Sequence, residues 1–438
     1  MKKFVSRLLA LIMVLSLSAC GNNANETEAP AESKDASFYE VTEPIEIVWW
    51  HALETQYDEL VAQIVNEFNS SQDKITVKAE YKGSYTEIHE ALALANKDGS
   101  GLPAVTVANT PYVADYGAAG LCENLTPYIA ATGFDIDDFG AGLIEASSYE
   151  GNNIALPFLI STQVVYYNKT MADALGITIP AKVEDWDAVM AEFAAKKPGV
   201  YFTEIPGWDH WYFETLYRNS GLAMIAEDGL TTDLNSDKGV AMTEKIQNWV
   251  NEGYAKWCYG TDASANMRQD FQDQKTFSVM HTSSLYNTYV DRCADFEVGM
   301  SWYPSVDGNA DSEIGGCVLL IPAKNTQEVK NAAWVFLQYL CSKDINMTWA
   351  KETGYMPTRN SVLQTEEGTA FLAEKPAFQC IFDNLDLIKP RIQNPSYSQL
   401  TNTWKDYMNL IMGENEDAKT QLDAAAKIIN EMLEENAE

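Results

Sequence analysis

The stretch Ala155–Lys169, Ala-Leu-Pro-Phe-Leu-Ile-Ser-Thr-Gln-Val-Val-Tyr-Tyr-Asn-Lys, decides the fold that we expect for this chain. An apolar run is interrupted at Pro157, the hydroxyl residues Ser161 and Thr162 follow, and a strand resumes over Val164–Tyr167. Proline donates no backbone hydrogen bond, so it tends to end a strand ladder. A strand that stops, exposes two hydroxyls and restarts is typical of a chain crossing between two sheets, where a ligand cleft can form. The alternative is an ordinary pair of buried strands joined by a loop.

The N-terminal segment indicates export and attachment to a membrane. Three basic residues precede the apolar run Leu8–Leu17, which suits a signal peptide and is too short to span a bilayer. The run ends in Leu17-Ser18-Ala19-Cys20, which resembles the lipobox of bacterial lipoproteins. We therefore expect a signal peptide over residues 1–19, a lipidated Cys20 and a disordered polar tether over residues 20–44. A secreted protein with a chance cysteine is the alternative.

Composition limits the class of the remaining chain. Its length allows two or three domain-sized cores, and 46% of the residues are apolar. The formal net charge of −33 argues against nucleic acid as a partner, because phosphates need a cationic face. Six cysteines remain besides Cys20, and no Cys-x-x-Cys motif occurs among them. One disulfide is plausible in an exported protein, and free buried thiols are an equal alternative. These cysteines are Cys122, Cys258, Cys293, Cys317, Cys341 and Cys380.

Strands and helices alternate after the tether. Strand patterns over 45–50, 75–81 and 104–108 alternate with helical patterns over 57–69 and 85–97. This order predicts a parallel or mixed α/β sheet, because parallel neighbours need long crossovers. Further helices are expected over 112–119, 169–175, 186–196, 238–252, 265–272, 329–340, 345–352, 397–410 and 418–434. Further strands are expected over 277–280, 297–302 and 317–321.

Motifs for catalysis, metals and cofactors are missing from the sequence. The four histidines lie far apart and form no ligand pair, so we expect no metal. No Gly-x-Ser-x-Gly elbow, phosphate-binding loop or dinucleotide fingerprint occurs, so we expect no catalytic serine and no cofactor. An acidic pair of the glycosidase kind stays open, although chance pairs are common in so acidic a chain.

Tryptophan is the positive signal. The chain has 11 tryptophans, and flat aromatic rings can cover the apolar faces of sugars. Core packing is the ordinary role of a single tryptophan, but Trp208 follows Gly207 among polar neighbours, which favours a cleft. Five tryptophans lie at predicted strand ends or loops, namely Trp49, Trp50, Trp208, Trp211 and Trp302.

Six segments together resemble a known family. They are Val48-Trp49-Trp50-His51, Tyr81-Lys82-Gly83-Ser84-Tyr85, the crossover from Leu156-Pro157-Phe158 to Tyr166-Tyr167-Asn168-Lys169, Gly207-Trp208, Ile314-Gly315-Gly316 and Thr353-Gly354-Tyr355-Met356-Pro357. On these segments the chain resembles the carbohydrate-type extracellular solute-binding proteins of bacterial ABC importers, and within that family the glycerol-3-phosphate binders above all. The resemblance covers the chain from Ile45 to the C-terminal helix.

The resemblance implies a two-lobed α/β fold of the type II periplasmic-binding-protein kind, with hinge strands and a ligand cleft between the lobes. We expect the first lobe over residues 45–158 and 304–356, and the second over 159–303 and 357–438. The resemblance also implies ligand contacts by hydroxyls, a backbone amide and aromatic rings, which would bind the ligand without adding charge. These groups come from Tyr85, Ser161, Trp208, Ser283, Gly316 and Tyr355. Further possible ligand contacts are Trp50, His51 and Trp211.

Two positions depart from the glycerol-phosphate pattern. A glutamate that holds glycerol hydroxyls in that group aligns with Thr110, and an arginine that holds the phosphate aligns with Gln399. Loss of a bidentate guanidinium should remove much of the phosphate affinity. We therefore expect an uncharged carbohydrate as ligand, with glycerol-3-phosphate or its diesters as the alternative if Arg391 or Arg359 replaces the missing arginine.

The resemblance also implies partners and a role. We expect a monomeric, membrane-anchored binding protein that is not an enzyme and that delivers its ligand to ABC permease subunits. The competing classes are an exported glycoside hydrolase and a surface adhesin or scaffold.

Overall fold

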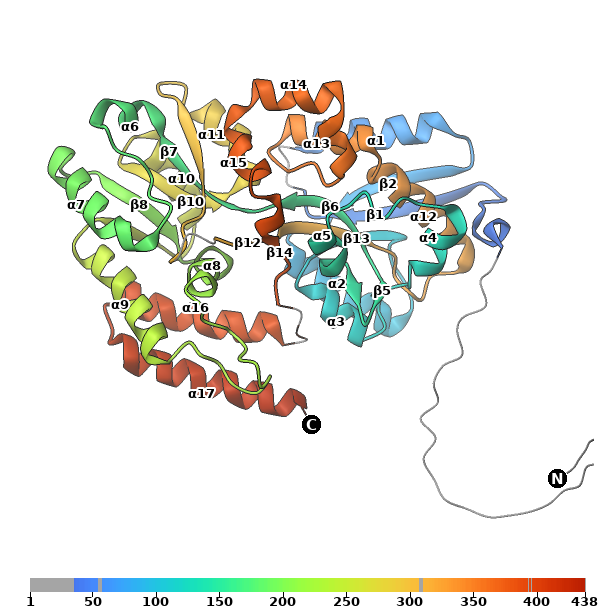
Figure 1. The fold of residues 1–438 in the computed structure, drawn as a ribbon. Helices are drawn as coiled ribbons and strands as arrows, with labels where there is room; N and C mark the ends of the chain where they lie inside the picture. Colours follow the sequence, from blue (N-terminus) through green and yellow to red (C-terminus); the bar gives the residue numbers. More distant parts are fainter. Residues whose placement is uncertain (1–34, 54–56, 307–309, 393, 395, 438) are drawn as a thin grey trace, which may run out of the picture.

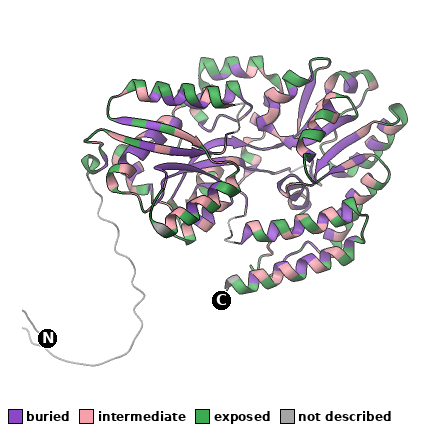
Figure 2. Cartoon of the chain, turned by 180° about the vertical axis from the view of Figure 1, so that it is seen from behind, coloured by how far each residue is buried: buried purple, intermediate pink, exposed green. Residues whose placement is uncertain are grey.

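Two lobes, each built on a five-stranded sheet, make up the protein (Figure 1). The structure is a computed structural model that describes residues 35–437 apart from 54–56, 307–309, 393 and 395. The strands of both sheets are largely buried, whereas the outer faces of the helices are exposed (Figure 2). This is the two-lobed α/β fold expected from the sequence.

The first lobe contains a mixed sheet with the strand order β2-β1-β3-β13-β6. β1 is parallel to β2 and β3, whereas β13 runs antiparallel between β3 and β6. The strands are β1 (Ile45–His51), β2 (Ile75–Tyr81), β3 (Val105–Asn109), β6 (Leu156–Ser161) and β13 (Gly315–Leu320). The helices are α1 (Asp58–Ser71), α2 (Tyr85–Asp98), α3 (Tyr112–Ala118), α4 (Thr126–Thr132), α5 (Ala141–Ala146), α12 (Gln327–Leu340) and α13 (Lys343–Glu352). β13 thus comes from a much later part of the chain than its two neighbours, β3 and β6.

The second lobe contains a sheet with the strand order β11-β7-β10-β8-β9. β7 is antiparallel to β11 and β10, whereas β10, β8 and β9 are parallel. The strands are β7 (Gln163–Asn168), β8 (Tyr201–Pro206), β9 (Ala255–Cys258), β10 (Thr276–Thr282) and β11 (Val298–Trp302). The helices are α6 (Lys169–Leu175), α7 (Trp186–Lys196), α8 (Trp211–Asn219), α9 (Asp237–Asn251), α10 (Ala263–Gln272), α11 (Tyr286–Arg292), α16 (Tyr397–Gly413) and α17 (Ala418–Ala437).

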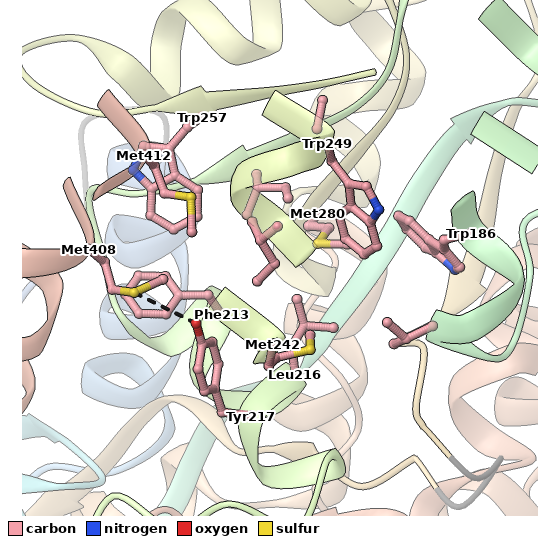
Figure 3. Packing of buried hydrophobic residues seen from close by; sticks show 14 of the residues in the cluster. Trp186, Phe213, Leu216, Tyr217, Met242, Trp249, Trp257, Met280, Met408 and Met412 are labelled. Carbon is pink, nitrogen blue, oxygen red and sulfur yellow. Dashed lines mark hydrogen bonds between the residues drawn. The ribbon is translucent and has the colours of Figure 1, made fainter. Parts of the chain in front are cut away.

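Aromatic and methionine side chains fill the core of the second lobe (Figure 3). Trp186 and Trp249 stack with ring centroids 5.7 Å apart, and the Tyr217 hydroxyl lies 3.7 Å from the Met408 sulfur. Methionine suits such a core because its flexible chain fills irregular gaps between rigid rings. Tryptophans thus serve mainly as core residues here, as they do around Trp49 in the first lobe.

Two chain segments cross side by side between the lobes. Thr162 separates β6 from β7, and its hydroxyl donates a hydrogen bond to Ser312 Oγ at 2.5 Å. Gln163 Oε1 accepts hydrogen bonds from Ser312 Oγ (2.7 Å) and from Glu313 N (3.0 Å). Ser312 and Glu313 form β12, which pairs in parallel with β14 (Ile388–Lys389) of a third, later passage. That passage also carries α14 (Glu366–Glu374) and α15 (Gln379–Phe382).

The strand before the crossing differs from the expectation. β6 stays in the first sheet as far as Ser161, so the chain crosses at Thr162 and not after residue 158. Pro157 lies inside β6, which is possible because β6 is the edge strand of its sheet. Ser161 and Thr162 are buried, so the prediction of two exposed hydroxyls is wrong.

Ten residues of the expected tether, 35–44, are described and pack on the first lobe. The signal peptide, Cys20 and most of the tether lie outside the described residues. Residues 35–44 are described, and they contain the 3-10 turn η1 (Ala36–Tyr39). Tyr39 is buried against Tyr128 at a ring distance of 4.4 Å, and Asn331 Nδ2 donates to the Phe38 carbonyl at 2.8 Å. The first lobe therefore includes residues before Ile45.

Candidate ligand-binding cleft

Three cavities between the lobes form the candidate site, and described residues of both lobes line each one. Cavity A has a volume of about 630 Å³, and it is lined by Ala52, Leu53, Tyr57, Tyr85, Tyr212, Asp262, Ser264, Ala265, Arg268, His281, Thr282, Ser284, Leu285, Thr288, Arg292 and Tyr355. Cavity B, of about 270 Å³, is lined by Thr86, Asn109, Pro111, Tyr112, Trp208, Asp209, His210, Arg391, Tyr397, Ser398, Thr401 and Asn402. Cavity C, of about 400 Å³, adjoins cavity A because both share Tyr57, Ser284 and Thr288.

Two predicted site residues, Tyr85 and Tyr355, meet in cavity A. Tyr85 begins α2 because the Ser84 hydroxyl accepts from Glu87 N (3.2 Å) while the Glu87 carboxylate accepts from Ser84 N (2.7 Å). The two phenols lie close enough that each affects the pKa of the other, and Ser284 of the second lobe also affects the pKa of Tyr355. Burial raises the pKa of both phenols, so both stay neutral.

Trp208 is held at the cleft by a tight turn after β8. Gly207 packs so closely on Trp257 that a Cβ there would lie 2.1 Å from the indole nitrogen. The ring of Trp208 lies 5.7 Å from that of Tyr212 and 5.7 Å from that of His281. Trp208, Tyr212 and His281 thus form an aromatic wall that extends from cavity B into cavity A.

The wall carries no charge at neutral pH. His281 Nδ1 lies 2.9 Å from the Tyr289 hydroxyl. Burial, and then the charge of Arg268, lowers the pKa of His281 to about 3. An uncharged aromatic wall suits a ligand with apolar ring faces and hydroxyl groups.

Of the two arginines considered as replacements, Arg391 lines the cleft. It is almost fully buried in the wall of cavity B, where its Nη2 lies 2.7 Å from His210 Nε2. Glu214 and Glu313 lie close behind it, and Tyr397 donates to Glu214 Oε2 at 2.5 Å. Burial, followed by the repulsion of Glu313, raises the pKa of Glu214.

Arg359 has a structural role in the first lobe. Its Nε donates to the Cys341 carbonyl at 2.7 Å and its Nη1 to the Asp135 carbonyl at 2.9 Å. The guanidinium also stacks over Phe134 and Phe139, at 4.8 and 4.4 Å from the ring centroids. Arg359 lines none of the three cavities.

Ser161, Ser283 and Trp211 lie in the hinge and line none of these cavities. The Ser283 hydroxyl accepts a hydrogen bond from Thr162 N at 3.1 Å, and Ser283 is fully buried. Ser161 and Trp211 flank Gly315, where a Cβ would lie 2.8 Å from Ser161 Oγ and 2.5 Å from the Trp211 ring. The hydroxyls and the indole therefore pack the joint between the lobes.

Gly316 also belongs to the hinge sheet and not to a cavity wall. Its φ of +90° is one that other residues rarely adopt. A Cβ at this position would lie 1.9 Å from the Leu159 carbonyl oxygen. The glycine is required by the close approach of β6 and β13.

Four further predicted residues lie near the cleft without lining these cavities. Thr110 is fully buried after β3, and Trp50 lies under Lys82, whose Nζ is 4.8 Å from the ring centroid. His51 Nδ1 accepts from Leu53 N at 3.3 Å, which shapes a loop lining cavity A. Gln399 is exposed on α16, whereas Ser398, Thr401 and Asn402 of the same helix line cavity B. The ligand-binding roles of all the residues that do not line a cavity stay predictions.

Sequence reasoning missed several cavity residues, chiefly Tyr57, Tyr112, Tyr212, Arg268 and Arg292. Tyr212 sits beside the Trp-rich segment, so the cluster of aromatics around Trp208 was a usable signal. The arginines lie on helices α10 and α11 that look ordinary in the sequence, and only the fold places them at the cleft.

Three further observations concern metals, membranes and cysteines. Among the described residues, no group of three or more His, Cys, Asp or Glu side chains is arranged to hold a metal ion. Within the same ranges no helix has the length and apolar character needed to cross a bilayer. All six cysteines between residues 35 and 437 are free thiols.

Comparison with known proteins identifies relatives over most of the chain. The family model described as bacterial extracellular solute-binding protein matches residues 63–379. The sn-glycerol-3-phosphate-binding periplasmic protein UgpB of Agrobacterium fabrum is 23% identical over 399 residues, covering 86% of this chain and 90% of that protein. UgpB of Brucella melitensis is 22% identical over 402 residues, covering 87% and 92%.

Solved structures share the fold at lower identity. UgpB from Mycobacterium tuberculosis in complex with glycerophosphocholine has a TM-score of 0.80 and 19% identity, covering 91% of this chain and 100% of that one. The GacH receptor of Streptomyces glaucescens, solved with and without acarbose, has a TM-score of 0.78 and 20% identity, covering 89% and 98%. The sugar-binding protein MalE of Xanthomonas citri has a TM-score of 0.77 and 17% identity, covering 89% and 98%.

Proposed function

Since the chain belongs to the bacterial extracellular solute-binding proteins, we propose that it captures a carbohydrate between its two lobes and delivers it to an ABC permease. The family works outside the cytoplasm, and its members are binding proteins. The observation that carries the proposal is the wall of the cleft. Cavity A joins three tyrosines of the first lobe to Tyr212, His281 and Ser284 of the second. Aromatic faces and neutral hydroxyls are the groups that bind sugar rings.

Lobe closure is the proposed mechanism. Because both lobes contribute to each cavity, a ligand makes its full set of contacts only when the lobes are close together. Ligand binding then shifts the population from open to closed forms. The closed, monomeric protein docks on the permease, and a separate subunit hydrolyses ATP. No step in this sequence requires catalysis by the chain, so we propose that it is not an enzyme.

The ligand has a second candidate. Several relatives are named as glycerol-3-phosphate binders, and one similar structure holds glycerophosphocholine. Arg391 in the wall of cavity B favours glycerol-3-phosphate or a glycerophosphodiester, since a guanidinium matches a phosphate group. Asp209, however, lines the same cavity and its charge already acts on Arg391.

Attachment to the membrane is part of the proposal. The lipobox-like sequence before Cys20 supports cleavage at that cysteine and its lipidation. The polar residues that follow would connect the lipid to the first lobe, leaving the cleft free to meet solute. Mass spectrometry of the membrane fraction tests this proposal, because a lipidated Cys20 adds a diacylglycerol to the N-terminal peptide.

The first experiment is a thermal-melting panel on residues 21–438. It compares neutral mono- and oligosaccharides, acidic sugars, glycerol-3-phosphate and glycerophosphodiesters. A specific ligand at one hundred times its dissociation constant should stabilise the protein by about 2.7 kcal/mol. A higher melting temperature with a carbohydrate supports the proposal, and one only with glycerol phosphates supports the second candidate. No change in melting temperature with any compound contradicts both.

A control separates binding from hydrolysis. The ligand found in the panel is incubated with the protein for a day and then analysed by chromatography. A binding protein returns the ligand unchanged, whereas cleavage products would support the glycoside hydrolase instead.

A further inference from the structure

Two arginines of the second lobe line cavity A. Arg268 lies on α10 and Arg292 at the end of α11, and neither forms a salt bridge with a described residue. The chain has 63 acidic and 30 basic residues, so a cation in it has many acidic partners available. The wall of cavity A thus carries two arginines that no described acid pairs with.

Arg268 is held in position along the cavity wall. Its Nη1 donates to Ser264 Oγ, one helical turn away, at 2.7 Å, and Ser264 lines the same cavity. Its charge acts on the buried groups around it, since it lowers the pKa of His281 and opposes the burial that raises the pKa of Tyr212. The guanidinium therefore lies close to the aromatic wall where we expect a sugar ring.

Charge balance distinguishes cavity A from cavity B. Among the described residues that line cavity A, Asp262 is the single acid against two arginines, and it is exposed. In cavity B, the single arginine, Arg391, has an acidic neighbour in the same wall, Asp209, whose charge acts on it. An anionic ligand group would thus find an excess of positive charge in the wall of cavity A and balanced charge in the wall of cavity B, while three acids, Glu59, Asp291 and Glu352, line the adjoining cavity C.

The sequence argument for an uncharged ligand stays a prediction. It depended on Gln399 occupying an anion-binding position, but Gln399 is exposed and lines none of the three cavities. The charge of the ligand has to be inferred from the residues that do line the cleft.

We propose that cavity A binds an acidic carbohydrate, with Arg268 holding the carboxylate or phosphate group and Arg292 adding positive charge beside it. This inference rests on the proposed carbohydrate-binding function and narrows its ligand class. The sugar ring lies on the neutral wall of Tyr85, Tyr212 and His281, while its anionic group points toward α10. Arg292 is exposed, so its contribution is mainly electrostatic and weaker than that of Arg268.

The test measures the affinity of residues 21–438 for matched neutral and acidic sugars by titration calorimetry. The probes are glucose, glucuronate and glucose 6-phosphate, together with neutral and uronate oligosaccharides. We expect an acidic member of the set to bind at least ten times more tightly than its neutral counterpart. Titration of the tighter binder at pH 5 and pH 7 distinguishes the two anions, because a phosphate monoester gains charge near pH 6 whereas a carboxylate does not.

Variants locate the anion. Arg268→Gln should weaken binding of the acidic sugar at least tenfold and leave a neutral sugar nearly unaffected, and Arg268→Lys should recover part of the loss. The matched control is Lys427→Gln, which removes an exposed cation of α17 that lines none of the three cavities. Unchanged melting temperatures without ligand establish that the variants fold.

The outcomes separate this inference from the proposed function. Binding of neutral sugars with no preference for acidic ones overturns the inference and leaves the carbohydrate function standing. A loss of acidic-sugar binding in Arg391→Gln but not in Arg268→Gln also overturns it, since the anion would then lie in cavity B. Binding of glycerophosphodiesters alone overturns the carbohydrate function and the inference together.

Discussion

Among the described residues, Trp208 is the one tryptophan that lines a cleft cavity. Most of the others pack in the cores, including Trp49, Trp186, Trp334 and Trp404. A high tryptophan count was therefore a weak guide to function, whereas the local context of Trp208 was a strong one. The glycine before it and the polar residues after it marked a ring that leaves the core.

Replacing Trp208 by alanine should weaken ligand binding by at least about tenfold, because large aromatic residues at the centre of a binding site carry much of its energy. Calorimetry with the ligand from the panel checks this. Tyr259→Ala is the control, since Tyr259 is a partly exposed aromatic of the same lobe that lines none of the three cavities. Equal losses in the two variants would place the ligand away from Trp208.

Glu204 gives the second lobe a pH-dependent stability. It is fully buried in β8, and burial raises its pKa to about 7 from a usual 4.5. Between about pH 4.5 and pH 7, Glu204 is therefore protonated in the folded protein and ionised in the unfolded protein. Its contribution to the free energy of unfolding falls as the pH rises through that range.

Glu204→Gln should stabilise the protein, and more at pH 8 than at pH 5. The amide is neutral throughout, so the gain should grow by about 2–3 kcal/mol between these pH values. Urea unfolding of the wild type and the variant at both pH values gives the difference directly. A gain of the same size at pH 5 and pH 8 would contradict a raised pKa.

At the scale of elements, the hinge consists of short strands that are held together by side-chain hydrogen bonds. Thr162, Gln163 and Ser312 bind one another, and Tyr166 donates to the Thr282 carbonyl at 2.9 Å. Several residues predicted as ligand contacts serve this joint, because the chain crosses near the base of the cleft. Proximity to the ligand and contact with it are different properties, and the sequence order alone does not separate them.

The adjacent serines at the end of β10 should behave differently when each is replaced by alanine. Ser283→Ala removes the acceptor for the buried Thr162 N–H and should lower the free energy of unfolding by about 1–3 kcal/mol. Ser284→Ala should mainly weaken ligand binding, because Ser284 lines cavities A and C. Denaturant unfolding and calorimetry on both variants form the test. Loss of stability in Ser284→Ala together with loss of binding in Ser283→Ala would contradict the roles given to the two serines.

Helices and strands whose apolar residues recur at a regular spacing were predicted well from the sequence. The helix expected over 57–69 spans Asp58–Ser71, and its apolar face of Val61, Ile64, Val65 and Phe68 is buried. β8 was missed because it is buried on both faces and contains Glu204 and Pro206, so it has neither alternation nor an apolar run. α8 was missed because the Trp-rich residues before it were interpreted as a loop.

Site residues on helices were harder to predict than those on strands. On α16, one residue of shift turns a side chain by about 100°, which separates exposed Gln399 from Ser398 in cavity B. Tyr85 and Tyr355, which line cavity A, were predicted from the resemblance to a known family and not from helical periodicity. The choice of face on a helix depends on packing that only the folded molecule provides.

At the scale of the whole molecule, hydrophobic packing holds the lobes without disulfides. The six cysteines of the described chain are free, and burial raises the pKa of each thiol. Two cores of more than twenty buried residues each make covalent links unnecessary.

The thiol state predicts a simple measurement on residues 21–438. Six thiols should react with Ellman's reagent in denaturant, and far more slowly in the native protein, because buried, protonated thiols are poor nucleophiles. The melting temperature should be the same with and without a reducing agent. Fewer than six reactive thiols, together with a lower melting temperature after reduction, would reveal a disulfide.

The position of β13 in the first sheet governs the order in which the protein can fold as it is synthesised. β13 lies between β3 and β6 and pairs with both, so these two strands are not joined in one sheet until residues 315–320 have emerged. The five strands of the second sheet lie within residues 163–302 and are complete earlier. A nascent chain therefore holds an open first sheet while most of its length is made, and the last strand to arrive closes that sheet from its interior.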